Sequence, residues 1–275
     1  MAQAVLITGC SSGIGRATAE RLAGRGFTVY ATARKVASIA DLEARGCRVL
    51  ALDVTDEDSM RGAVETVIAE HGAVHALVNN AGYSQSGAIE EVPIADVRRQ
   101  FETNVFGLVR MCQLVLPSMR ARRAGRIVNV SSMGANFTFP GGGQYHATKY
   151  AVEALTDALR MEVKAFGIDV ALIEPGVTRS EFVEKTTDSD GMGGESDSPY
   201  AAMRVSVSTS NNEAYSNRMM SASAESVAQV VASAVAADRP RTRYLLTPAA
   251  KAMAATHAVA GDRVWDRLMA RQFSL

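Results

Sequence analysis

Short apolar runs alternate with amphipathic segments along the whole chain. The run Ala4-Val5-Leu6-Ile7 suits a strand buried on both faces. Runs of the same kind predict further strands near 27–32, 48–52, 74–79, 126–130, 168–173 and 243–246. Helical spacing of apolar residues predicts helices from 14 to about 26 and near 36–45, 56–71, 95–122, 144–166, 225–237 and 249–270. This alternation predicts an α/β fold, a doubly wound parallel sheet with helices on both faces.

A glycine-rich turn follows the first predicted strand at once. The segment Thr8-Gly9-Cys10-Ser11-Ser12-Gly13-Ile14-Gly15 joins that strand to a helix, the unit in which backbone N–H groups and a helix N-terminus bind a pyrophosphate. We expect Gly9 to permit the turn, Gly13 to allow close approach of a cofactor, and Gly15 to let the helix pack on the strand. The spacing differs from Gly-x-Gly-x-x-Gly, and a loop that serves only the backbone is the alternative.

Two ionisable side chains, Tyr145 and Lys149, share one face of a predicted helix that begins shortly after Ser132. A tyrosine phenol has a pKa of about 10, so it is a poor base at neutral pH unless a nearby cation stabilises its anion. We expect the Lys149 ammonium to lower the pKa of Tyr145, and the Ser132 hydroxyl to hold the reacting oxygen. The trio predicts acid/base chemistry at a carbonyl or an alcohol. Two surface side chains on an ordinary helix are the alternative.

Length and charge exclude several classes of protein. The 275 residues suit one domain with a large core. Lysine plus arginine and aspartate plus glutamate both number 29, so the formal net charge is zero, and we expect neither nucleic acid nor an anionic membrane as a partner. No run approaches the roughly eighteen uncharged apolar residues of a membrane span, and no basic segment precedes the first strand. We therefore expect a cytoplasmic protein.

Cysteine and histidine give no metal or disulfide prediction. Cys10, Cys47 and Cys112 are odd in number and lack Cys-x-x-Cys spacing, so we expect free thiols and no zinc site. The four histidines are scattered, and His146, next to Tyr145, is interpreted as a bystander.

Five landmarks in order carry a resemblance to a known family. They are Thr-Gly-x-x-x-Gly-Ile-Gly from Thr8, the segment Asn79-Asn80-Ala81-Gly82, Asn104, Ser132 with Tyr145-x-x-x-Lys149, and Pro175-Gly176. With these the chain resembles a short-chain dehydrogenase/reductase, from residue 4 to about 182, and more loosely over the last third. The resemblance implies a Rossmann-type domain that binds a nicotinamide dinucleotide and transfers hydride.

The resemblance also implies which residues act. The catalytic set would be Asn104, Ser132, Tyr145 and Lys149. By resemblance, the backbone carbonyl of Asn104 holds a water that passes protons between Lys149 and solvent, with a capping or helix-bulge role as the alternative. The cofactor-binding residues would be Gly9, Ser11, Ser12, Gly13, Ile14, Gly15, Arg34, Lys35, Asp53, Val54, Asn80, Ala81, Gly82, Tyr145, Lys149, Pro175, Gly176, Val177 and Ser180.

The end of the second strand indicates which dinucleotide binds. An acidic residue there would accept hydrogen bonds from an adenosine ribose, but this chain has Arg34 and Lys35 instead. A guanidinium suits a 2′-phosphate because it donates two parallel bonds, and the Ser12 hydroxyl could add a third contact. NADP(H) is therefore predicted over NAD(H), which remains possible. A solvated surface charge is the alternative for Arg34.

The substrate is predicted only as a class. The glycine turn and the Glu174-Pro175-Gly176 segment resemble the 17β-hydroxysteroid and retinol dehydrogenase branch, which implies a bulky apolar ketone or alcohol. The expected substrate-binding residues are Tyr83, Ser132, Ala135, Phe137, Phe139, Tyr145 and Phe182, with Pro140 beside them. Ordinary core positions are the alternative for several. A 3-oxoacyl-thioester reductase and a non-catalytic cofactor-binding regulator are the other functions considered.

The last third of the chain and the surfaces of two long helices give two further expectations. The polar segment at about 183–223 is expected to be a substrate lid, followed by a C-terminal helical extension at about 249–272. The helices near 95–122 and 144–166 are apolar on more than one face, so we expect a homodimer or homotetramer. In the competing account the C-terminal helices cover that surface, and sedimentation would separate the two.

Overall fold

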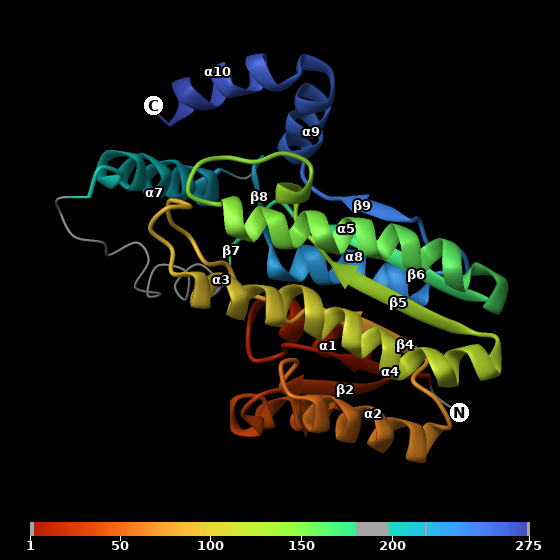
Figure 1. Cartoon of the computed structure of the whole chain (residues 1–275). Coiled ribbons are helices and arrows are strands. Elements are labelled where there is room, and N and C mark those ends of the chain that lie inside the picture. Colours follow the sequence, from red (N-terminus) through yellow and green to blue (C-terminus); the bar gives the residue numbers. More distant parts are fainter. Residues whose placement is uncertain (1–2, 180–197, 218, 274–275) are drawn as a thin grey trace.

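In the described part of the chain, seven parallel strands form the central sheet (Figure 1). A computed structural model describes residues 3–179, 198–217 and 219–273. The strands are β1 (Ala4–Ile7), β2 (Thr28–Ala33), β3 (Arg48–Ala51), β4 (Ala76–Asn79), β5 (Gly125–Val130), β6 (Ile168–Glu174) and β9 (Arg243–Leu245). They lie in the order β3-β2-β1-β4-β5-β6-β9, and each neighbouring pair is parallel. Each strand predicted from the sequence is confirmed.

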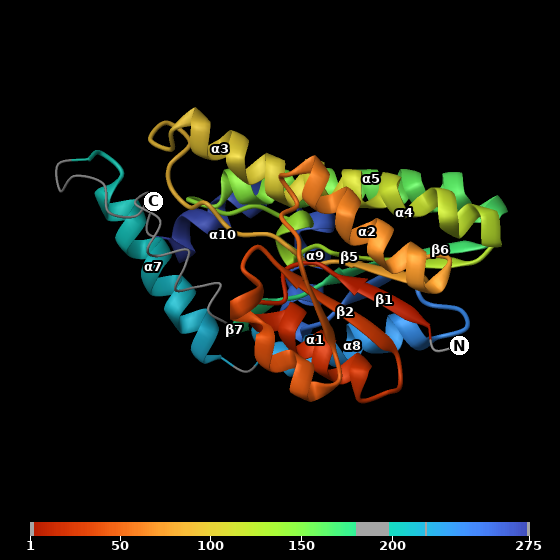
Figure 2. The ribbon, with the colours of Figure 1, turned by 90° about the horizontal axis from the view of Figure 1, so that it is seen from below.

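Helices cover both faces of this sheet. On one face lie α2 (Glu57–His71), α4 (Gly107–Arg122) and α5 (Gly143–Val163); on the other lie α1 (Gly13–Ala23) and α8 (Ala224–Ala236) (Figure 2). Two neighbouring parallel strands are joined by a crossover connection, which is usually a helix. That helix packs on one face of the sheet. The predicted doubly wound α/β fold is confirmed.

Alternate residues of β1 enter two separate hydrophobic cores. Ala4 and Leu6 belong to the core beneath α2, α4 and α5, whereas Val5 and Ile7 belong to the core beneath α1 and α8. All four are completely buried. Successive side chains of a strand point to opposite faces, so a strand covered on both faces needs an unbroken apolar run.

Three predicted helices differ in form from the observed ones. Residues 36–45 form two short 3-10 helices, η1 (Val36–Ser38) and η2 (Ala40–Arg45). The helix predicted at 95–122 consists of α3 (Ile94–Phe101), a π-helical turn η3 (Glu102–Phe106) and α4. The helix predicted at 249–270 is divided into α9 (Pro248–Ala260) and α10 (Asp262–Gln272), because Gly261 between them has a left-handed φ of 71°.

The C-terminal helices pack around the loop that follows β5. This loop contains the short helix η4 (Met133–Ala135), and a third apolar cluster joins it to α9, α10 and the helix α7 (Ala201–Ser216). Its buried members are Met133, Phe137, Val207, Ala250, Trp265, Met269 and Phe273. The indole Nε1 of Trp265 also donates to the Thr138 carbonyl oxygen at 2.9 Å. The C-terminal extension therefore supports this loop.

The polar segment expected to be a lid is described only in part. It contains α7 and the strand β8 (Ser221–Ser223), which pairs with β7 (Val177–Arg179). Residues 180–197 and 218 lie outside the described residues. The segment thus includes a helix that the sequence pattern did not predict, and closure over a substrate stays a prediction.

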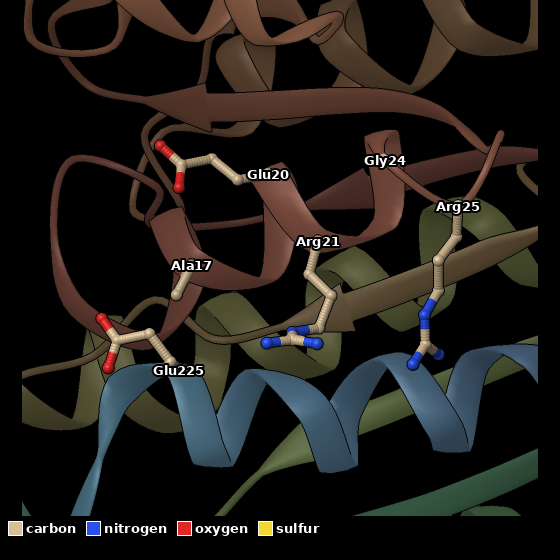
Figure 3. A pocket seen from close by; sticks show the side chains of 6 residues that line it. All are labelled: Ala17, Glu20, Arg21, Gly24, Arg25 and Glu225. Carbon is tan, nitrogen blue, oxygen red and sulfur yellow. The ribbon is translucent and has the colours of Figure 1, made fainter.

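A groove lies between α1 and α8, on the face of the sheet that these two helices cover (Figure 3). Its lining residues are Ala17, Glu20, Arg21, Gly24, Arg25 and Glu225. None of the residues predicted to act in catalysis or cofactor binding lines it. Within the described part of the chain, no helix combines the length and apolar character that a bilayer span requires.

Close packing of α1 on the end of β1 gives the first prediction. A Cβ atom added at Gly15 would lie 2.3 Å from the Gly9 carbonyl oxygen and 2.5 Å from Asn80 Nδ2. We expect Gly15→Ala to lower the free energy of unfolding by about 1–3 kcal/mol, as overpacking does. The control Gly62→Ala on α2, where a Cβ would meet nothing within 4 Å, should be neutral or stabilising. Equal unfolding midpoints for the two variants in denaturant would contradict the packing argument.

Candidate active site

The strand order reverses between β1 and β4, and the predicted site residues gather at the carboxyl ends of these strands and of β5. Such a reversal opens a crevice where α/β proteins bind ligands. Hydrogen bonds lock two of the segments together there. The Thr8 hydroxyl accepts from the backbone N–H groups of Asn80 and Ala81, both at 3.0 Å. Asn80 Nδ2 donates to the carbonyl oxygens of Thr8 and Gly9 at 2.9 Å.

The backbone of the glycine turn depends on its glycines. Gly9 and Gly13 have φ values of 72° and 59°, and a Cβ at Gly9 would lie 2.8 Å from the Ala81 Cα. Ser12 is the N-cap of α1, and its side chain makes no capping hydrogen bond in the described structure. Ser11 is exposed, and Ser12, Gly13 and Ile14 are partly exposed. The N–H groups at this helix N-terminus therefore fit an anionic ligand.

The residues expected to contact adenosine lie at the next strand ends. Arg34 and Lys35 are exposed directly after β2. Asp53 follows β3, and its Oδ1 accepts from the N–H and the hydroxyl of Thr55 at 3.0 and 2.8 Å. Val54 is buried, and its carbonyl oxygen would lie 2.5 Å from a Cβ at Gly107, so α4 approaches this strand end closely. The structure thus places basic and acidic candidates along one edge.

Ser132, Tyr145 and Lys149 lie together where β5 meets α5. A hydrogen bond joins the side chains of Ser132 and Tyr145. The Lys149 Nζ lies 5.7 Å from the centroid of the Tyr145 ring and donates to the Val130 carbonyl oxygen at 3.0 Å. Lys149 is buried, whereas Ser132 and Tyr145 are partly exposed. The two hydroxyls are therefore within reach of a ligand, and the ammonium lies behind them.

Burial controls the ionisation of Tyr145. It raises the pKa of Tyr145 from its ordinary 10.0 to about 12, although the hydrogen bond with Ser132 acts in the opposite direction. Lys149 is not among the groups that shift this pKa in the protein alone, where loss of water around the phenol is the largest cause. The expected lowering by Lys149 stays a prediction for the site with its cofactor bound. Tyr145 is thus protonated at neutral pH and suited to donate a proton.

The pKa of Lys149 is shifted downward, in the opposite direction to that of Tyr145. Burial lowers the pKa of its ammonium from 10.5 to about 8, and the Glu153 carboxylate one helical turn away opposes the fall. Glu153 in turn is paired with Arg243 of β9. Lys149 therefore keeps most of its charge at neutral pH with the help of a carboxylate that the sequence analysis did not single out.

Asn104 lies in the π-helical turn between α3 and α4. Its side chain bridges two segments: Nδ2 donates to the Tyr83 carbonyl oxygen at 2.8 Å and to the Thr148 hydroxyl at 3.1 Å, while Oδ1 accepts from Tyr83 N–H at 3.0 Å. The π-helical turn is a helix bulge of the kind that the structural alternative for Asn104 named, and such turns are frequent at functional sites. The water-holding role of its carbonyl stays a prediction.

The expected substrate-binding residues fall into three groups. Tyr83 and Phe139 are partly exposed. Ala135 and Phe137 are buried, and Phe137 packs in the third apolar cluster, 5.2 Å from the ring of Trp265, so its position fits the core alternative. Phe182 lies outside the described residues, as does Ser180 of the cofactor set.

The segment Pro175-Gly176-Val177 begins after β6 and continues into β7. The Pro175 carbonyl accepts from Met133 N–H at 2.8 Å, which joins this segment to the loop that carries Ser132. A Cβ at Gly176 would lie 2.6 Å from the Thr247 hydroxyl, so only glycine fits. Pro175 and Gly176 are buried and Val177 is partly exposed.

Sequence analysis missed two threonines that build the site. Thr8 fastens the glycine turn to Asn80, and Thr148 accepts from Asn104 while its hydroxyl donates to the Tyr145 carbonyl oxygen at 2.7 Å. Both are buried. A buried hydroxyl inside a motif is a usable signal, because it must find partners among its neighbours.

Comparison with known proteins agrees with this geometry. The model of the short chain dehydrogenase family matches residues 3–191. A 3-ketodihydrosphingosine reductase from Bacteroides thetaiotaomicron is 42% identical over 195 residues, which are 71% of each chain. An NADPH-dependent 3-dehydrocapnine reductase from Ornithobacterium rhinotracheale is 32% identical over 272 residues, 96% of this chain and 94% of that one. A solved short-chain dehydrogenase from Streptomyces avermitilis has a TM-score of 0.81 at 34% identity, covering 94% of this chain and 93% of that one.

The chain therefore belongs to the short-chain dehydrogenase family, as its landmarks predict. It is an NAD(P)-dependent oxidoreductase with a single Rossmann-type domain. The narrower prediction, the 17β-hydroxysteroid and retinol dehydrogenase branch, stays a prediction.

The charge state of Lys149 can be measured directly. We expect this lysine, one of five in the chain, to titrate near pH 8, and Glu153→Gln to lower its pKa further, because the variant loses the charge that favours the ammonium. NMR of lysine labelled at Cε would report the titration, with Lys149→Arg for assignment. Glu162→Gln, an exposed carboxylate on α5, is the control and should change nothing. Titration near 10.5, or no response to Glu153→Gln, would refute the assignment.

Proposed function

We propose that the protein is an NADPH-dependent reductase of a carbonyl group in a bulky, apolar substrate. The observation that carries the proposal is the hydrogen-bonded pair of Ser132 and Tyr145 backed by the buried Lys149. These side chains lie at the sheet edge that also holds the glycine turn. A protonated phenol, a hydroxyl and a cation beside one another are the groups that carbonyl reduction requires.

Each residue has a defined task in this proposal. Bound NADPH supplies the hydride that reaches the carbonyl carbon. Tyr145 donates its proton to the carbonyl oxygen, and Ser132 holds that oxygen by a hydrogen bond. Lys149 stabilises the tyrosinate that remains and holds the cofactor ribose. The backbone carbonyl of Asn104 holds a water through which Lys149 regains protons from solvent. Tyr145 is protonated at neutral pH, and this is the form that donates a proton in reduction.

The choice of NADPH rests on the basic pair after β2. Arg34 and Lys35 are exposed at the position where an acidic residue would select NADH. A guanidinium can donate two parallel bonds to a 2′-phosphate. The name of the Ornithobacterium relative, an NADPH-dependent reductase, supports the same choice.

The substrate class rests on the relatives and on the residues around the site. Two relatives are named for the reduction of 3-keto and 3-dehydro compounds, 3-ketodihydrosphingosine and 3-dehydrocapnine. Apolar side chains adjoin the catalytic hydroxyls, with the Phe139 ring partly exposed beside η4. We therefore place long-chain 3-keto lipids beside steroids and retinoids in the class of bulky apolar ketones and alcohols.

Exposed apolar side chains on or beside α4 and α5 support a homo-oligomer. Phe106, Tyr150 and Met161, on or beside α4 and α5, are 55%, 40% and 69% exposed, which supports pairing of these helices in a homo-oligomer. Trp265 packs on Phe137 instead of covering that surface. Cytoplasmic location stays a prediction.

The reductase function is tested by turnover. With a panel of long-chain 3-ketones, steroid ketones, retinal, short ketones and acetoacetyl thioesters, NADPH absorbance should fall with a bulky apolar ketone. We expect Tyr145→Phe to reduce kcat about 10²- to 10⁴-fold with cofactor binding intact. Tyr150→Phe, an exposed tyrosine on α5, is the matched control and should retain full activity. Turnover by Tyr145→Phe equal to that of Tyr150→Phe would refute the proposal, and preference for acetoacetyl thioesters would redirect it.

Cofactor choice is tested by charge removal. Arg34→Ala should raise the KM for NADPH about 10- to 100-fold, the equivalent of one charge-assisted contact, and leave the KM for NADH unchanged. Arg25→Ala, which removes an exposed arginine beside the groove between α1 and α8, should change neither. Equal effects of the two variants would show that Arg34 is a solvated surface charge.

A further inference from the structure

His146 is a buried histidine that the proposed reaction does not use. It follows Tyr145 on α5 and is 1% exposed. Its Nδ1 lies 2.6 Å from the Gly134 carbonyl oxygen. Because a carbonyl oxygen only accepts, Nδ1 carries the hydrogen. Nε2 has no hydrogen-bond partner in the described structure, and burial lowers the pKa of His146, so the ring is neutral.

The imidazole fills a slot shaped by two glycines. A Cβ at Gly134 would lie 2.5 Å from Nδ1, and one at Gly142 would lie 2.7 Å from Nε2. The Phe139 ring meets the imidazole edge-on, with centroids 4.3 Å apart. No larger residue than glycine can occupy either position without displacing the ring. His146 is thus held in one orientation by the loop that it contacts.

Gly134 connects this histidine to the catalytic serine. Its carbonyl accepts from His146, and its N–H donates to the Ser132 hydroxyl oxygen at 3.1 Å. Glycine has the widest backbone freedom of any residue, and a hydrogen bond at each of its backbone polar groups restricts that freedom. On the sheet side the loop is already fastened by Met133 N–H to the Pro175 carbonyl. On the helix side, His146 supplies the corresponding bond.

We infer that His146 is a positioning residue: by clamping Gly134 it orients the Ser132 hydroxyl toward Tyr145. With the Gly134 N–H as one partner, the serine hydroxyl is directed at the neighbouring phenol and at the substrate oxygen between them. The inference rests on the proposed function, because it assigns His146 a role only through Ser132. It replaces the interpretation of His146 as a bystander.

The first test compares two amides. His146→Asn places an N–H donor at the position of Nδ1, whereas His146→Gln places it farther along, at the position of Nε2. We expect His146→Asn to keep kcat within about fivefold of the parent, and His146→Gln and His146→Leu to lose about 10- to 100-fold, with the cofactor Kd unchanged. Equal kcat values for the Asn and Gln variants, or a parallel loss of cofactor binding, would overturn the inference.

The second test is a double-mutant cycle with Ser132→Ala. If His146 acts through the serine, His146→Gln in the Ser132→Ala background should change kcat less than about twofold. A loss as large as in the parent background would overturn the inference and leave the proposed function intact. Full turnover by Ser132→Ala alone would overturn the proposed function and the inference together.

Discussion

Burial of the Lys149 ammonium is the constraint on which the rest of the site depends. A cation removed from water needs compensating partners, and Lys149 finds them in the Val130 carbonyl at the end of β5 and in Glu153 on its own helix. These contacts fix α5 against the strand end. Tyr145, one helical turn earlier, then faces Ser132, the second residue after that strand.

The same strand edge carries the cofactor candidates because all sheet strands run in parallel. Their carboxyl ends emerge together, and the reversal of strand order between β1 and β4 separates the two connections that would otherwise close the crevice. Thr8 and Asn80 span that reversal with hydrogen bonds of 3.0 and 2.9 Å. These hydrogen bonds fix the start of the glycine turn relative to the end of β4.

Much of this arrangement could be predicted from the sequence. Buried parallel strands are continuous apolar runs, and the spacing of Tyr145 and Lys149 places them on one helical face whatever surrounds them. The helix α7 lies within a polar segment, depends on tertiary packing and left no clear periodic signal. The division of the C-terminal helix has a local cause, the left-handed backbone of Gly261, which the apolar periodicity on both sides of it conceals.

The electrostatics of the site could not be predicted in the same way. The sequence places an ammonium near a phenol, which suggests a lowered pKa for Tyr145, but it does not give the depth at which either group lies. The structure adds that depth, and burial reverses the expected direction. Likewise the slot for His146 depends on Gly134 and Gly142, and only the fold shows that both glycines face the same imidazole ring.

The protonation state of the Tyr145 phenol decides whether the site holds a proton donor. NMR of tyrosine labelled at Cζ, with Tyr145→Phe to assign one of seven tyrosine signals, would follow its ionisation in the protein alone. The account predicts that Tyr145 stays protonated up to pH values above the ordinary 10.0, with a pKa of about 12. A titration of Tyr145 near neutral pH would contradict it, because the site would then hold a ready-made base instead of a proton donor.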